Sequence, residues 1–285
     1  QKQCMEVCHQ ILASEVINSD LLSYNNRQIA IKCYPIGVNP ELIQQVAQQE
    51  TEISHPVFEF EDLTDQKTII SVDRIDYSKG LIERFNAYEE FLKTNPEYHK
   101  NITDLQIACP CRMEISAYKN LYDHLKSRID FINQEFSQDD WSPINCTHET
   151  VSHDELMKIY RQANICWVNS LRDGMNLVAK EYVAAQNSED PGVLILSKYA
   201  GAAEQMSEAI IVDPEDRNSM IKGLKKALTM SKAERLDRYK HLMKGLQRFN
   251  INDWRNAFLE DLRRAEALKI FTPQLRKSYN RVVQY

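Results

Sequence analysis

Short apolar segments alternate with helical segments along most of this chain, and this alternation limits the possible folds more than any other feature. The segments between the apolar runs carry apolar residues at helical spacing. The apolar runs occur at 68–72, 105–108, 144–147, 165–168, 193–196 and 209–212. Strands that are separated by helices pair in parallel and are covered on both faces. The sequence therefore predicts an α/β fold built on a Rossmann-like doubly wound parallel sheet.

The two ends of the chain have a different pattern. Residues 1–14 have helical spacing, and residues 29–34 read as a strand. A second helix is predicted to start at Pro40, with Asn39 as its N-cap. The polar segment 50–67 has no regular period and is interpreted as a linker. Beyond the last apolar run, the pattern predicts helices at 216–229, 231–249 and 251–267.

Composition and charge exclude several classes of protein. The net charge of −6 over 285 residues argues against a protein that binds nucleic acid or an anionic membrane surface. No apolar run is long enough to cross a bilayer, and no signal-peptide pattern opens the chain. Seven cysteines without a secretory pattern favour a reducing, cytoplasmic location.

Motifs for the common cofactors are missing from the sequence. The close pair Cys109 and Cys111 has no second Cys or His pair at zinc spacing, and no Asp-x-Asp triplet occurs that could hold a divalent ion. Neither a P-loop nor a dinucleotide fingerprint is present, and no Ser-His-Asp set has nucleophile-elbow spacing. The sequence therefore predicts neither a metal site nor a bound cofactor.

Cations follow the first strand of the predicted sheet. Arg74 and Lys79 lie in the loop after residues 68–72, and Gly80 ends that loop where a helix begins. An arginine fork with a lysine point charge suits a diphosphate. The alternative is an ion pair of Arg74 with Asp73 or Asp76. In parallel sheets, ligands bind at the carboxyl ends of the strands, which is where this loop lies.

The segment from Leu171 to Glu181 is a second candidate. It follows the strand at 165–168, and Gly174 marks the point where a helix is about to begin. The start of a helix offers free backbone N–H groups that suit an anion or sugar hydroxyls. Asp173 could accept hydrogen bonds from hydroxyls, and Glu181 could face the same pocket. The alternative is that Asp173 is an N-cap and Glu181 a solvated residue.

Three further residues lie past strand ends. Arg112 follows the strand at 105–108 and could bind a phosphate across a cleft or merely cover the end of the sheet. His148 and His153 flank the end of another strand. A structural or solvent role is favoured for both histidines, because spacing implies no carboxylate partner for either.

Taken together, these stretches resemble the trehalose-6-phosphate synthases, a family of retaining glycosyltransferases with the two-domain GT-B fold. The resemblance covers nearly the whole chain, in order and at the family's spacing. One departure is Cys111, which stands where the family has Ser or Thr. The matching segments are 34–41, 71–81, 106–108 with Arg112, 171–186, 191–197 and 200–204.

The resemblance implies roles for particular residues. Arg74 and Lys79 match the pair that holds the donor diphosphate and acts in catalysis. Asp173 is similar to the aspartate that binds glucose hydroxyls, and Glu181 looks like the ribose ligand. The remaining donor contacts, made mainly by backbone N–H groups, are implied at Gly174, Met175, Asn176, Leu177, Val178, Ala179 and Lys180. Val151 falls where the backbone meets uracil, and Arg112 resembles the contact to the acceptor's phosphate.

The resemblance also implies a reaction and a domain organisation. Glucose would pass from UDP-glucose to glucose 6-phosphate, giving trehalose 6-phosphate. Residues 51–250 would form the nucleotide-sugar-binding carboxy-terminal domain of a GT-B enzyme. Residues 1–50 would connect it to an amino-terminal domain that the chain lacks, and 251–285 would form a helical crossover. We expect this fragment alone to be inactive, and homo-oligomers are possible.

Two other functions stay open at the level of sequence. A sister synthase could use another phosphorylated acceptor, such as glycerol 3-phosphate, because the family reads the acceptor mainly with the absent domain. A regulatory module could bind nucleotide sugars without turnover. The intact set of Arg74, Lys79, Asp173 and Glu181 argues against loss of the site.

Overall fold

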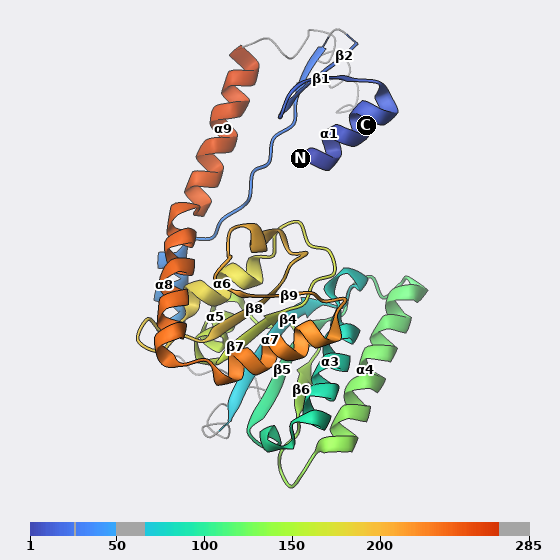
Figure 1. Ribbon diagram of the computed structural model, residues 1–285, viewed down its shortest axis with the longest axis vertical. Helices are drawn as coiled ribbons and strands as arrows, with labels where there is room; N and C mark the ends of the chain where they lie inside the picture. The colour runs from blue at the N-terminus through green and yellow to red at the C-terminus, as the bar shows by residue number, and fades with distance from the viewer. Residues whose placement is uncertain (26, 50–65, 268–285) are drawn as a thin grey trace. The chain divides into compact units, whose positions relative to one another are not determined.

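The computed structural model describes residues 1–25, 27–49 and 66–267 (Figure 1). They belong to two compact units, one formed by 37–250 and the other by the segments on either side of it. The predicted linker at 50–67 lies outside the described residues, apart from its last two positions. The domain division drawn from the sequence, with boundaries after residues 50 and 250, stays a prediction.

The larger unit is built on a parallel sheet of six strands, as the sequence predicted. The strand order is β6-β5-β4-β7-β8-β9, and every neighbouring pair is parallel. The apolar runs form these strands because each is bounded by polar loops and covered by helices. The strands are β4 (Lys67–Arg74), β5 (Ile102–Cys109), β6 (Ile144–Thr147), β7 (Ile165–Val168), β8 (Val193–Ser197) and β9 (Ile210–Val212).

Helices cover both faces of this sheet (Figure 1). One face carries α2 (Pro40–Ala47), α5 (His153–Gln162), α6 (Leu177–Ala185) and α8 (Lys232–Arg248). The other carries α3 (Leu81–Thr94), α4 (Ser116–Phe136) and α7 (Arg217–Thr229). Side chains alternate between the two cores along each strand: Ile70 and Cys166 face the first, while Ile69 and Ile165 face the second.

The order of the strands creates one switch point. From β4 the chain moves outward to β5 and β6, and it then returns to the other side of β4 and continues through β7, β8 and β9. Strands β4 and β7 pair through Ile69 with Ile165 and Ile70 with Cys166. The loops after these two strands leave in opposite directions, which opens a crevice where doubly wound sheets bind ligands.

The smaller unit holds α1 (Lys2–Leu12), α9 (Ile251–Ala267) and an antiparallel sheet of β1 (Glu15–Asn18), β2 (Leu21–Tyr24) and β3 (Arg27–Ala30). The strand predicted at 29–34 was wrong beyond residue 30, and the first two strands were not predicted. Each of these strands has four residues and no more than two consecutive apolar residues, so each leaves only a weak signal in the sequence. β1 and β3 are exposed, whereas β2 is partly buried. Across the described residues, no helix has both the length and the apolar character that a membrane span requires.

Candidate functional site

The two candidate loops are joined at the switch point. The loop after β4 contains the 3-10 turn η3 (Tyr77–Lys79). The carbonyl oxygen of Ser78 accepts hydrogen bonds from the backbone N–H groups of Leu171, at 2.7 Å, and Arg172, at 3.2 Å. The side chain of Asn169 donates to the carbonyl of Gly80 at 2.9 Å. The loops after β4 and β7 therefore form one continuous wall.

Gly80 permits this close approach. Its φ is +61°, and an added Cβ would lie 2.4 Å from the carbonyl oxygen of Asn169. A left-handed φ is strained for residues with a side chain, and the clash is with backbone atoms that cannot move aside. The glycine is thus required both by the turn and by the contact between the two loops.

Lys79 and Asp173 meet across this wall. The ammonium of Lys79 lies 2.7 Å from Oδ2 of Asp173, and both side chains are mostly buried. Burial acts to raise the pKa of Asp173, but the hydrogen bond and charge of Lys79, together with the hydrogen bonds from Asn176 and Met175, lower it. Sequence reasoning placed these residues on the same edge of the sheet; the direct ion pair between them is new.

The carboxylate of Asp173 is also held by its own loop. It accepts hydrogen bonds from the backbone of Met175 at 3.3 Å, from the side chain of Asn176 at 3.2 Å and from the hydroxyl of Ser170 at 3.4 Å. Asp173 is not the N-cap of α6, which was the alternative left open by the sequence. That position belongs to Asn176, whose side chain accepts from the N–H of Ala179 at 2.9 Å.

The start of α6 leaves backbone donors available beside this carboxylate. Among the described residues, none accepts a hydrogen bond from the N–H groups of Leu177 or Val178. These are the unpaired donors that any helix start carries. An added Cβ on Gly174 would meet no atom within 4 Å, so this residue borders open space. The arrangement can accept an oxygen-rich ligand close to the backbone.

Substituting two glycines in this wall should change the free energy of unfolding by different amounts. Gly174→Ala should leave the free energy of unfolding nearly unchanged, because the added methyl group enters open space. Gly201→Ala should cost about 1–3 kcal/mol, because its Cβ would lie 2.2 Å from the carbonyl oxygen of Gly174. Urea unfolding of both variants measures the difference. Equal loss of stability would contradict the open space at Gly174.

Arg74 lies near Asp76, one of the two ion-pair partners that the sequence left open as an alternative to diphosphate binding. Its guanidinium lies 3.7 Å from Oδ2 of Asp76, and its side chain is 56% exposed. An exposed pair at this distance contributes little stability. The carboxylate of Asp76 is itself fixed by the backbone and hydroxyl of Ser78. Arg74 is therefore loosely paired and can turn to a ligand.

Glu181 has a partner that spacing did not reveal. Its Oε1 lies 3.7 Å from Nε2 of His153, in the first turn of α5. Burial raises the pKa of Glu181, while His153 opposes this rise. The helices α5 and α6 pack together, and this packing brings His153 to Glu181 although 28 positions separate them in the chain.

Val151 lies beside the same helix. It precedes the Ser152 N-cap of α5 and is half-buried against the core.

Arg112 lies on the next loop along the same edge of the sheet. It has a left-handed φ of 50°, is exposed and donates a hydrogen bond to the hydroxyl of Tyr118 at 2.8 Å. His148, which the sequence assigned a structural or solvent role, has Nδ1 2.9 Å from the carbonyl oxygen of Ala108. No group of metal-ligating side chains occurs in the described part of the chain.

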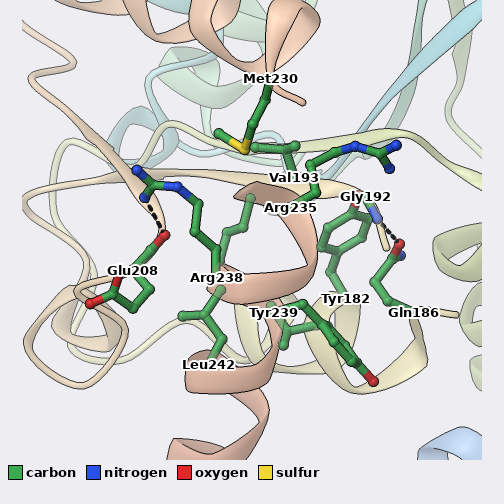
Figure 2. A pocket seen from close by; sticks show the side chains of 12 residues that line it. Tyr182, Gln186, Gly192, Val193, Glu208, Met230, Arg235, Arg238, Tyr239 and Leu242 are labelled. Carbon is green, nitrogen blue, oxygen red and sulfur yellow. Dashed lines mark hydrogen bonds between the residues drawn. The ribbon is translucent and has the colours of Figure 1, made fainter. Parts of the chain in front are cut away.

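A pocket lies elsewhere, at the amino end of β8 between α6 and α8 (Figure 2). None of the predicted ligand residues lines it. Its polar groups are already paired, since Arg238 donates to the carbonyl of Glu208 at 2.7 Å. Gln186 accepts from the N–H of Gly192, also at 2.7 Å. This pocket is therefore a packing feature on the opposite edge of the sheet.

Comparison with known proteins identifies the family of this chain. Residues 1–264 match glycosyltransferase family 20. The chain belongs to this family. The trehalose-6-phosphate synthase of Sodalis glossinidius is 41% identical over 250 residues, which make up 88% of this chain and 53% of the relative.

Solved structures place this family 20 chain in the GT-B fold. The Escherichia coli trehalose-6-phosphate structure bound with UDP-2-fluoro glucose is 36% identical, with a TM-score of 0.87, over 90% of this chain and 57% of that chain. The Burkholderia xenovorans alpha,alpha-trehalose-phosphate synthase in complex with glucose-6-phosphate is 39% identical, with a TM-score of 0.86, over 90% and 57%. The chain thus spans about half the length of these relatives, and the predicted fold class is confirmed.

Proposed function

We propose that this chain forms the donor-binding wall of an enzyme that transfers glucose from UDP-glucose to glucose 6-phosphate, giving trehalose 6-phosphate and UDP. The observation that carries the proposal is the Lys79–Asp173 pair beside the start of α6, at the switch point of the sheet. The likeness to structures bound with UDP-2-fluoro glucose and glucose-6-phosphate supports it.

The chemistry of the site fits the departure of a nucleoside diphosphate. Negative charge grows on UDP as the glycosidic bond breaks, and the cations of Lys79, which is fixed against Asp173, and of Arg74, which can turn to the ligand, would stabilise it without a metal. Asp173 would accept hydrogen bonds from glucose hydroxyls. The segment from Gly174 to Val178 would lie against the diphosphate and the sugar, with the N–H groups of Leu177 and Val178 as donors.

The outer parts of the donor would lie further along the same wall. Glu181 would bind the ribose hydroxyls, and the backbone at Val151 would meet the uracil ring. Arg112 would bind the acceptor's phosphate as a planar fork.

The chain spans about half the length of its relatives, and we therefore propose that turnover needs an amino-terminal domain. We also propose that the whole enzyme works in the cytoplasm and that it can form homo-oligomers.

Replacing Asp173 with asparagine tests the assignment of the sugar-binding position. Asp173→Asn should weaken binding of UDP-glucose by roughly tenfold, which corresponds to one hydrogen bond to a charged group. Binding of UDP, which has no glucose, should change much less. Isothermal calorimetry with both ligands measures the two effects. Equal weakening of UDP and UDP-glucose, or binding of neither by the unmodified chain, would contradict the proposed function.

A further inference from the structure

Arg112 is an exposed arginine with unusual local support. It follows β5 on a short segment, and its own carbonyl accepts the N–H of Ile115 at 2.9 Å. A long exposed side chain normally samples many rotamers, and it loses this freedom when it binds a ligand. Groups that hold such a side chain in one orientation before binding reduce that loss.

Tyr118, in the first turn of α4, holds Arg112 in two ways. Its hydroxyl accepts a hydrogen bond from Nη1 at 2.8 Å. Its ring lies under the guanidinium, with Cζ 5.4 Å from the ring centroid, which is within the range of a cation–π contact. The two contacts fix both the position and the tilt of the guanidinium.

Tyr118 is in turn held by the loop that carries the donor cations. Its ring packs edge-to-face against the ring of Tyr77, with centroids 5.5 Å apart and planes at 76°. The hydroxyl of Tyr77 donates to the carbonyl of Ala117. Tyr77 belongs to η3, which ends at Lys79. The two tyrosines therefore connect the loop of Arg112 to the loop that follows Arg74 and carries Lys79.

Most of the Arg112 guanidinium stays available for a ligand. A guanidinium has five N–H donors, and the hydrogen bond to Tyr118 is the only one that Arg112 makes to a described side chain. The carboxylate of Asp76 lies close enough for the charges of both Arg74 and Arg112 to act on it. The free edge of the fork suits a phosphate, which arginine binds in a bidentate manner.

We propose that Tyr118 is a positioning residue that, with Tyr77, holds Arg112 in the orientation in which it binds the phosphate of a sugar phosphate acceptor. This inference rests on the proposed function, which gives Arg112 its ligand, and adds a residue that acts through Arg112. The hydroxyl of Tyr118 sets the position of the guanidinium, and the ring sets its tilt.

The test compares Tyr118→Phe, which keeps the ring, with Tyr118→Ala, which removes both contacts. Calorimetry should show glucose 6-phosphate binding weakened roughly three- to tenfold in Tyr118→Phe and further in Tyr118→Ala. UDP affinity should be unchanged in Tyr118→Phe, which keeps the ring that packs on Tyr77. Tyr98→Phe is the matched control, because Tyr98 packs on Phe91 away from Arg112, and it should bind both ligands normally.

Side-chain relaxation of Arg112 gives a second readout in the free chain. The Nε–H group of Arg112 should be ordered in the unmodified chain, less ordered in Tyr118→Phe and most mobile in Tyr118→Ala. Its resonance should shift with glucose 6-phosphate and not with glucose. Equal order in all three proteins, or no shift with glucose 6-phosphate, would overturn the inference. Failure of UDP to bind the unmodified chain would instead overturn the proposed function.

Discussion

Lys79→Ala should weaken UDP binding by roughly 10- to 100-fold, which is the range for losing a charge-assisted hydrogen bond to a phosphate. The side chain is mostly buried and fixed against Asp173, so its charge is placed before the ligand arrives. Its loss also leaves the carboxylate of Asp173 without its cation, close to where the diphosphate would bind. Isothermal calorimetry with UDP at constant ionic strength measures the change.

Two comparisons make the Lys79 result specific. Arg74→Ala should weaken UDP binding less, because Arg74 is 56% exposed and must lose rotamer freedom on binding. Lys100→Ala removes an exposed cation that pairs with Asp139 at the opposite edge of the sheet, and it should leave UDP binding unchanged. Equal UDP affinity in Lys79→Ala and the unmodified chain would contradict the assignment of the donor site.

The sheet and the edge that carries the site were predictable from the sequence. Each apolar run between helices became a strand, because a parallel sheet buries its strands on both faces and leaves a clear signal. The residues in the loops after 68–72 and 165–168 then had to lie on one edge, since parallel strands all end there. The sequence therefore placed three residues on the same edge of the sheet, although it gave no information about their contacts: Arg74, Lys79 and Asp173.

Contacts between distant side chains were not predictable. Nothing in the spacing of Glu181 and His153 indicates that they meet, because the packing of α5 on α6 decides this. The contact of Arg112 with Tyr118 spans only six positions, but it depends on the local path of the chain into α4. The N-cap of α6 was also missed, because Asp173 and Asn176 are both good capping residues. The asparagine takes that position because it directly precedes Leu177, where α6 begins, whereas Asp173 lies four positions before the helix. The strands β1 and β2 each contain only two consecutive apolar residues, which is too short a run to predict a strand.

A buried arginine lies beneath the donor loop. The side chain of Arg84 on α3 is fully buried, with Nη1 3.9 Å from Asp73 and Nε 3.8 Å from Asp104. Its Nη2 donates to the side chain of Gln106. Asp73 directly precedes Arg74 at the end of β4, so this group of charges supports the strand end that presents the donor cations.

Arg84→Met should lower the free energy of unfolding by about 3–5 kcal/mol at pH 8, which is typical for removing one partner from buried charges. Two carboxylates would then be buried without their cation. Urea unfolding followed by circular dichroism measures the loss. Lys93→Met on the same helix is the matched control: its side chain is 42% exposed and pairs with Glu89, so the change should stay within about 1 kcal/mol.

The pH dependence of the same variant identifies the cause of the loss. Burial raises the pKa of Asp73 to about 7 and of Asp104 to about 6, with Arg84 opposing both shifts. Between pH values of about 4 and about 7 the folded chain binds more protons than the unfolded chain. The free energy of unfolding therefore falls as the pH rises through this range. Removing Arg84 raises both pKa values further and extends this fall to higher pH. The variant should therefore lose less stability at pH 5 than at pH 8; a loss independent of pH would show that packing, and not charge, makes Arg84 necessary.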